Sequence, residues 1–126
     1  MILVDTSAWV EFLRGTGSET ALRLRDRDEE LAICDPVRLE VLAGARDDRH
    51  LASLQRLLDR ATTLPTEPAR YAVAGELYRT CRRRGRTVRS LFDCLIAAIA
   101  IAADIPVLHS DRDFDTLVTM TALRAA

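Results

Sequence analysis

The sequence contains no lysine, because all 18 of its basic residues are arginine. This absence excludes a phosphate-binding loop of the GK[ST] type and Schiff-base catalysis, since both need a lysine side chain. It also argues against a phosphoaspartate enzyme in which a lysine contacts the acyl phosphate.

Cysteines, aromatic residues and long apolar runs are also scarce. Three widely spaced cysteines, at positions 34, 81 and 94, do not form a disulfide framework and are expected to be core residues in a reducing cytoplasm. The longest apolar run, 94–103, is far shorter than the ~20 residues that span a membrane. The start, MILVDTSAWV, lacks the basic region of a signal peptide. We therefore expect a cytoplasmic protein without a membrane segment.

Length and charge set further bounds. With 126 residues, of which 48% are hydrophobic, the chain is expected to form one domain, 1–126, with its own core. The formal net charge is -1, so no overall basic field attracts nucleic acid, and any attraction must be local.

Short apolar segments alternate with helical patterns. Residues 2–4, 31–34, 61–64 and 105–108 are predicted strands, and 120–123 is a possible edge strand. The predicted helices are 7–14, one that opens at Ser18, 35–45, one from 47 to 58, 67–84, 90–103 and 111–118. This order predicts an α/β/α sandwich whose central, mostly parallel sheet has four to five strands. Ligands of such folds bind beyond the carboxyl ends of the strands.

Acidic residues stand at that edge of the predicted sheet. Asp5 follows the first strand, Asp111 and Asp113 follow the last, and Glu40 and Asp93 come in on helices. Two non-adjacent strands thus deliver carboxylates to one edge. Purely structural explanations also exist for most of them. Asp5 can cap a helix, Asp93 can form a capping box with the serine three residues earlier, and Asp111 and Asp113 suit a first helical turn.

Glu40 is harder to explain structurally. It lies in the mostly apolar stretch 37–45, and no residue three or four positions away can form an ion pair with it. A carboxylate among apolar residues needs a partner elsewhere, and a metal ion is one such partner.

Converging carboxylates repel one another, and a divalent cation relieves the conflict. All-oxygen ligands favour Mg²⁺ or Mn²⁺ over zinc, and the sequence has no paired-cysteine or histidine-rich zinc pattern. Such an ion deprotonates a bound water and stabilises an in-line phosphoryl displacement. This is the chemistry of metal-dependent nucleases.

At these positions the sequence resembles the PIN-domain ribonucleases, and among them the VapC toxins of bacterial toxin–antitoxin pairs. The matching segments, in order, are ILVDTSAWVEFL, DPVRLEVLAGA and VRSLFDCLIAAIAIAADIPVLHSDRDFD. The resemblance implies an endoribonuclease that uses Mg²⁺ or Mn²⁺ and cuts single-stranded or looped RNA of the tRNA or rRNA class. It also implies a small VapB-like antitoxin as partner and a homodimer.

The resemblance assigns roles to the acidic residues. Asp5, Glu40 and Asp93 fall on the three best-defined acidic positions of the family, with Asp5 and Asp93 as the main metal ligands. Glu40 would act directly or through bound water. Asp111 and Asp113 fall on the fourth acidic position, with Asp111 the closer to the metal.

Other residues are expected to support the site or to hold RNA. Thr6 and Ser7 would orient Asp5 and the bound water. The basic run before Asp93 is a candidate for phosphate contacts, because arginine forks suit phosphates. The alternative is a solvated helix end. The RNA-binding candidates are Arg83, Arg86, Arg89 and, between two candidate ligands, Arg112.

Three alternatives stay open at this stage. A metal-free ribonuclease would use histidine acid–base catalysis, and only His50 and His109 are available for it. A PIN domain without activity could bind RNA, although all the acidic positions are filled. A D-x-D phosphatase lacks its second aspartate here, because Asp5 is followed by Thr6 and Ser7.

Overall fold

The computed structural model describes residues 1–26 and 28–126. Within them, one parallel sheet has the order β3-β2-β1-β4. Its strands are β1 (Ile2–Val4), β2 (Leu31–Cys34), β3 (Thr62–Leu64) and β4 (Val107–Leu108). The first and last strands were expected to be non-adjacent, but β1 and β4 are hydrogen-bonded neighbours in this sheet. β1 is an inner strand, and β4 lies at the edge. The parallel four-stranded sheet confirms the predicted fold class.

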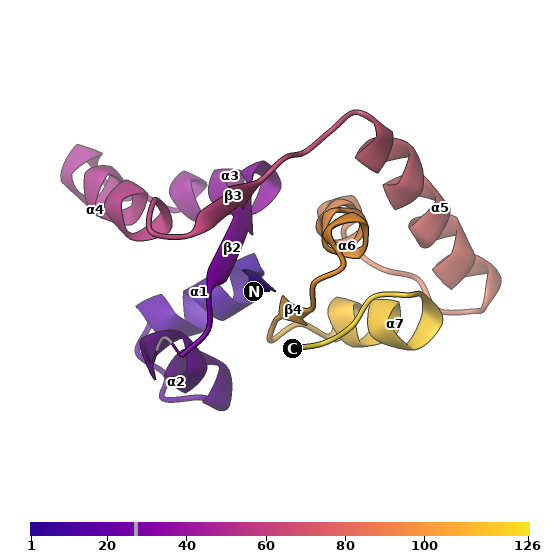
Figure 1. The fold of residues 1–126 in the computed structure, drawn as a ribbon, viewed down its shortest axis with the longest axis horizontal. Coiled ribbons are helices and arrows are strands. Elements are labelled where there is room, and N and C mark those ends of the chain that lie inside the picture. Colours follow the sequence, from indigo (N-terminus) through magenta and orange to yellow (C-terminus); the bar gives the residue numbers. More distant parts are fainter. Residues whose placement is uncertain (27) are drawn as a thin grey trace.

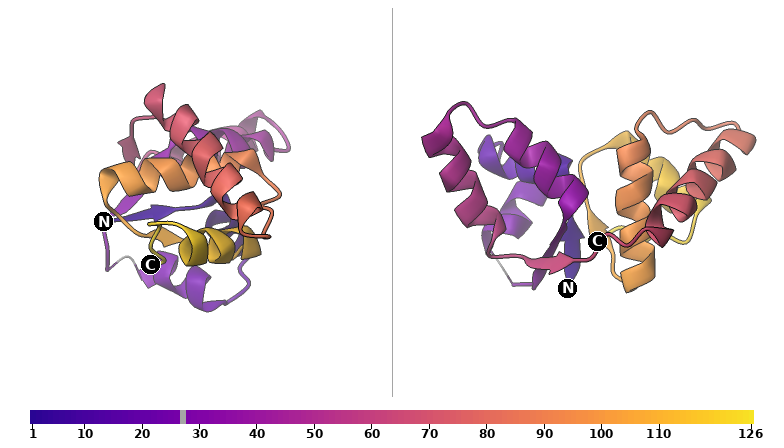
Figure 2. Two further views of the ribbon diagram at one scale, coloured as in Figure 1. Left: turned by 90° about the vertical axis from the view of Figure 1, so that its right-hand side faces the viewer. Right: turned by 90° about the horizontal axis from the view of Figure 1, so that it is seen from above.

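Helices cover both faces of the sheet. In Figures 1 and 2, α1 to α4 lie on one side, and α5, α6 and α7 lie on the other. The helices are α1 (Thr6–Leu13), α2 (Glu19–Asp26), α3 (Asp35–Ala43), α4 (Asp48–Leu58), α5 (Ala69–Arg83), α6 (Leu91–Ala103) and α7 (Arg112–Met120). Each predicted helix is present, with ends shifted by a few residues.

The central helix of the second layer is α6. Residues 93–100 of this helix are all buried, as expected of a helix that is apolar on every side. It stops at Asp104, whose φ of 55° is in the left-handed region that ends many helices. Because α6 is held so firmly, the acidic side chain in its first turn, Asp93, has a fixed place beside the sheet.

The predicted edge strand at 120–123 is wrong. α7 continues to Met120, because Leu117 is fully buried and Val118 and Met120 pack against the core from the same helix. The edge of β4 is instead paired by later residues. Val107 donates its N–H to the carbonyl of Arg124 at 2.9 Å and accepts the N–H of Ala126 at 2.9 Å.

The strand ends determine where the site lies. β1 and β4 run in the same direction, with Leu3 opposite Val107 and Val4 opposite Leu108. The residues that follow these two strands therefore emerge at one edge of the sheet.

Among the described residues, no helix is long and apolar enough to cross a membrane.

Candidate metal centre

Five carboxylates from four parts of the chain meet at the carboxyl edge of the sheet, and we call them the acidic cluster. Asp93, Asp111 and Asp113 each place a carboxylate oxygen within 4.8 Å of those of the other two. Asp5 and Glu40 are close enough for their charges to raise the pKa of Asp93. The structure thus brings together the five acidic residues singled out in the sequence.

Asp5 has one satisfied oxygen and one unsatisfied oxygen. Its Oδ2 accepts the backbone N–H of Ser7 at 3.0 Å and the hydroxyl of Ser7 at 2.6 Å, so it does cap α1. Its Oδ1 is buried and has no hydrogen-bond partner among the described residues. A buried acceptor without a partner is costly, and a bound cation would satisfy it. Capping therefore explains the position of Oδ2 but not the burial of Oδ1.

Glu40 reaches the site from α3. Its Oε1 accepts the hydroxyl of Thr6 at 2.9 Å. Burial, and after it the charges of Asp5 and Asp111, raise the pKa of Glu40, whereas the Thr6 hydrogen bond lowers it. The hydroxyls of Thr6 and Ser7 thus have different targets: Thr6 holds Glu40, and Ser7 holds Asp5.

The pKa of Asp93 is strongly raised. Its side chain is buried in the first turn of α6, and burial, followed by the charges of the other four acids, raises its pKa to about 8. Ser90 occupies the N-cap position of α6 but makes no side-chain capping bond. The capping box therefore does not explain Asp93, which accepts no hydrogen bond from any residue that the structure describes.

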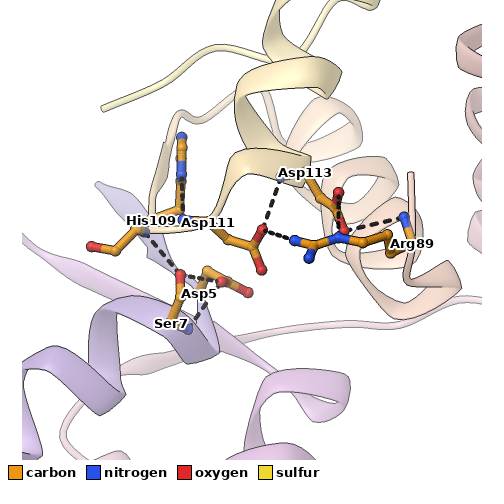
Figure 3. A network of polar contacts seen from close by, with 7 residues as sticks. Asp5, Ser7, Arg89, His109, Asp111 and Asp113 are labelled. Carbon is orange, nitrogen blue, oxygen red and sulfur yellow. Dashed lines mark hydrogen bonds and ion pairs between the residues drawn. The ribbon is translucent and has the colours of Figure 1, made fainter. Parts of the chain in front are cut away.

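Asp111 and Asp113 are linked to each other and to Arg89 (Figure 3). Asp111 caps α7, accepting the N–H of Asp113 at 2.8 Å. The guanidinium of Arg89 donates to Oδ1 of Asp111 and to Oδ1 of Asp113, each at 3.4 Å. The sequence suggested Arg89 only as an RNA contact. Its place in the loop just before α6, rather than inside a helix, was the available signal for a role beside Asp93.

Ser110 is a further residue that the sequence did not single out. Its backbone N–H donates to the hydroxyl oxygen of Ser7 at 2.9 Å and so links the segments that follow β1 and β4. Ser7 therefore joins the segment after β4 to Asp5. The pairing of β1 with β4 explains the link, and the sequence order alone did not reveal it.

The guanidinium groups of the other arginines proposed to bind RNA are exposed. The side chains of Arg86 and Arg112 are exposed and have no hydrogen bond or ion pair to any part of the chain that the structure describes. Arg83 is also exposed, and its one side-chain bond to a described residue is a long bond of 3.4 Å that it donates to Thr80. These three guanidinium groups are therefore available to solvent or to a ligand.

The two histidines are engaged by the protein. His109 stacks on Phe114, with ring centroids 5.2 Å apart, and its Nδ1 accepts the N–H of Asp111 at 3.3 Å. His50 was expected to be solvent-exposed, but it is half-buried on α4, and its Nδ1 accepts the N–H of Arg46 at 3.1 Å. They stand on different elements, and each has a ring nitrogen committed to the backbone.

A divalent cation fits the donor set of this site. Carboxylate oxygens are the donors that hard ions prefer, and one of them, Oδ1 of Asp5, is buried without a partner among residues 1–26 and 28–126. Burial, and after it the charges of the other four acids, raises the pKa of Asp93, and a bound cation would offset those charges. The carboxylates of this cluster would hold such an ion, which would supply Lewis-acid chemistry to an oxygen-rich substrate.

Comparison with known proteins places this geometry in a family. The model of the PIN domain family matches residues 2–118. Ribonuclease VapC11 of Mycobacterium tuberculosis is 44% identical over 131 aligned positions, covering 100% of this chain and 98% of the relative. Ribonuclease VapC19 of the same organism is 37% identical, covering 88% of this chain and 89% of the relative.

Solved structures agree on the fold. The DNA-bound VapBC complex from Salmonella typhimurium contains a chain that matches with a TM-score of 0.80 at 19% identity, covering 100% of this chain and 98% of that one. The parallel sheet, the acidic cluster at its carboxyl edge and the full-length match to a VapC ribonuclease lead to one conclusion: this chain belongs to the PIN-domain family and, within it, to the VapC ribonucleases.

Proposed function

We propose that the protein is a Mg²⁺- or Mn²⁺-dependent endoribonuclease and the toxin of a toxin–antitoxin pair. The observation that carries the proposal is the acidic cluster itself. Its five carboxylates come from separate parts of the chain, and the buried Oδ1 of Asp5 lacks a partner within the described structure. The relatives are named ribonucleases, and one protein of the same fold is described as a toxin that cleaves the sarcin–ricin loop.

The residues divide into two roles. Asp5, Asp93, Asp111 and Asp113 would hold the ion, which supplies an activated water and stabilises charge on the scissile phosphate. Glu40 has a raised pKa, and in the part of the chain that the structure describes only its Oε1 accepts a hydrogen bond, from Thr6. Its other oxygen is available to orient the attacking water and to accept a proton from it.

The substrate would be RNA of the tRNA or rRNA class, held by arginine forks. The exposed Arg83 and Arg86 precede the site, and Arg112 stands between two acids of the cluster. Binding through phosphates makes affinity fall steeply with salt concentration. The low aromatic content supports backbone contacts rather than base stacking as the main source of affinity.

A VapB-like antitoxin is the proposed partner, and the toxin would act in the cytoplasm as a homodimer. A groove that includes Glu40 supports such a partner, since it is lined by apolar side chains of α1, α3 and α4 and by two arginines just beyond the ends of α1 and α3. Those lining residues are Val10, Leu13, Arg14, Glu40, Val41, Gly44, Arg46, His50 and Leu54. Three free cysteines are compatible with a reducing compartment.

The test uses the purified chain and total cellular RNA. We expect cleavage with Mg²⁺ or Mn²⁺, its loss in EDTA, and its return when the ion is restored. Asp93→Asn should be inactive under all three conditions, whereas Glu76→Gln, on the exposed surface of α5, should behave like the wild type. Mapping of RNA 5′ ends would identify the target. Cleavage that persists in EDTA would contradict the proposal and favour histidine catalysis.

A further inference from the structure

Arg89 makes three contacts to the acidic cluster. Its Nε donates to Oδ1 of Asp113 and its Nη2 donates to Oδ1 of Asp111, each at 3.4 Å. Its backbone N–H donates to Oδ2 of Asp113 at 3.2 Å. Figure 3 shows the guanidinium lying between the two carboxylates. Among the described arginines and histidines, Arg89 is the residue whose side-chain charge pairs with the two aspartates at once.

The position of Arg89 does not depend on its guanidinium. Val88, the preceding residue, is 1% exposed and anchors the loop in the core, and Ser90 is the N-cap residue of α6. The backbone bond from Arg89 to Asp113 remains whichever side chain is present. The guanidinium itself is on the surface, since the Arg89 side chain is 61% exposed while that of Asp113 is 8% exposed. The charge can therefore move away without disturbing the loop.

The same carboxylates are candidate metal ligands. Asp111 and Asp113, with Asp93, have oxygens close enough together to share one ion. A cation bound there would lie only a few ångströms from the guanidinium, and two like charges at that distance repel. Without the ion, however, the guanidinium offsets repulsion among the carboxylates. One side chain thus has opposite effects on the metal-free and the metal-bound states.

We propose that Arg89 is a built-in counter-ion that competes with the divalent cation for Asp111 and Asp113 and so weakens metal binding. This inference rests on the proposed function, because it assumes a metal at the acidic cluster. Arg89 is a positioning residue in this account. In the metal-free state it stabilises the carboxylates against their mutual repulsion. It also raises the concentration of free ion that is needed to fill the site.

The experiment titrates the metal-free full chain with MnCl₂ and with MgCl₂, without RNA, by calorimetry at low ionic strength. Arg89→Met removes the charge and keeps an apolar stem, and Arg89→Lys keeps the charge. Arg86→Met is the matched control, because Arg86 is exposed and makes no side-chain bond in the structure as described. We expect the Kd for Mn²⁺ to fall about fivefold or more in Arg89→Met, because a repelling charge near the ion is removed.

The controls are expected to stay within about twofold of the wild type, since Arg86 is screened by solvent and lysine restores the charge. The metal-free melting temperature of Arg89→Met should lie below that of the wild type, and saturating Mn²⁺ should abolish the difference. Each result supports competition between the guanidinium and the ion.

Other outcomes overturn the inference. Weaker or unchanged Mn²⁺ binding in Arg89→Met would mean that Arg89 organises the ligands or has no influence on them. Equal tightening in Arg86→Met would indicate a general charge effect. In both cases the wild type still binds the ion, and the proposed function is unaffected. If the wild type itself binds neither ion, the metal site and the proposed function fail together with the inference.

Discussion

The hydroxyl of Thr6 donates a 2.9 Å hydrogen bond to Oε1 of Glu40, 34 positions further along the chain. The bond joins α1 to α3 across the site and lowers the pKa of Glu40 against the opposing effect of burial. Thr6→Val removes the donor and keeps the shape, so the glutamate loses its orientation and its pKa rises further. We expect about tenfold slower RNA cleavage. Thr6→Ser should restore most of the rate, and a Thr6→Val enzyme as fast as the wild type would contradict this role.

Asp5→Asn is expected to abolish cleavage without unfolding the protein. The amide oxygen can still accept the two bonds from Ser7, so the cap of α1 survives, and one repelling charge is lost. Cleavage should fall by more than about 100-fold, since the substitution removes a proposed metal ligand. Gel assays of RNA cleavage and thermal unfolding test both parts. Cleavage at the wild-type rate would show that Asp5 is not a ligand.

Ionisation of Asp93 should make the free energy of unfolding of the metal-free protein depend on pH. Its pKa is raised from 3.8 to about 8 in the folded protein, so the folded state binds this proton more tightly than the unfolded state. The resulting stabilisation is complete below pH 4 and is lost as the pH rises towards 8. In Asp93→Asn, which cannot ionise, this loss is absent.

Thermal unfolding of the metal-free wild type and Asp93→Asn between pH 5 and pH 8.5 measures this effect. The melting temperature of the variant should exceed that of the wild type by several degrees at pH 8.5, and the gap should narrow at pH 5. A constant difference across this range would show that the Asp93 proton is bound equally in both states.

RNA binding should lose part of its salt dependence when an exposed arginine is removed. Arg83→Ala deletes a guanidinium that makes one long bond within the described structure. The slope of log affinity against log salt should become shallower by about 0.7, as expected for one phosphate contact to a single strand. The binding can be measured in an Asp93→Asn background, which we expect to be catalytically inactive. An unchanged slope would support the interpretation of this arginine as part of a solvated helix end.

The sequence predicted the acidic cluster well because parallel strands impose a simple rule. Asp5 and Asp111 follow strands, and strands that run in one direction bring such residues to one edge. Glu40 stood out because its neighbours in sequence offered no partner. These inferences needed only local pattern and fold class, and the structure brings the residues together as they require.

Contacts between segments that are far apart in the chain could not be predicted from the sequence. The bond from Ser110 to Ser7 depends on β1 and β4 being neighbours, which the order of elements does not reveal. The link from Arg89 to Asp113 depends on how α6 and α7 pack. The supposed strand at 120–123 failed because burial of Leu117 favours helix over local strand preference.

The backbone bonds from Val107 to Arg124 and Ala126 have a consequence for self-association. An open sheet edge is a template on which another chain can add a strand. Here residues 124–126 occupy the free side of β4, which leaves β3, three residues long, as the exposed edge of the described sheet. A variant shortened by these residues would leave β4 as a second open edge, and we expect it to aggregate more readily.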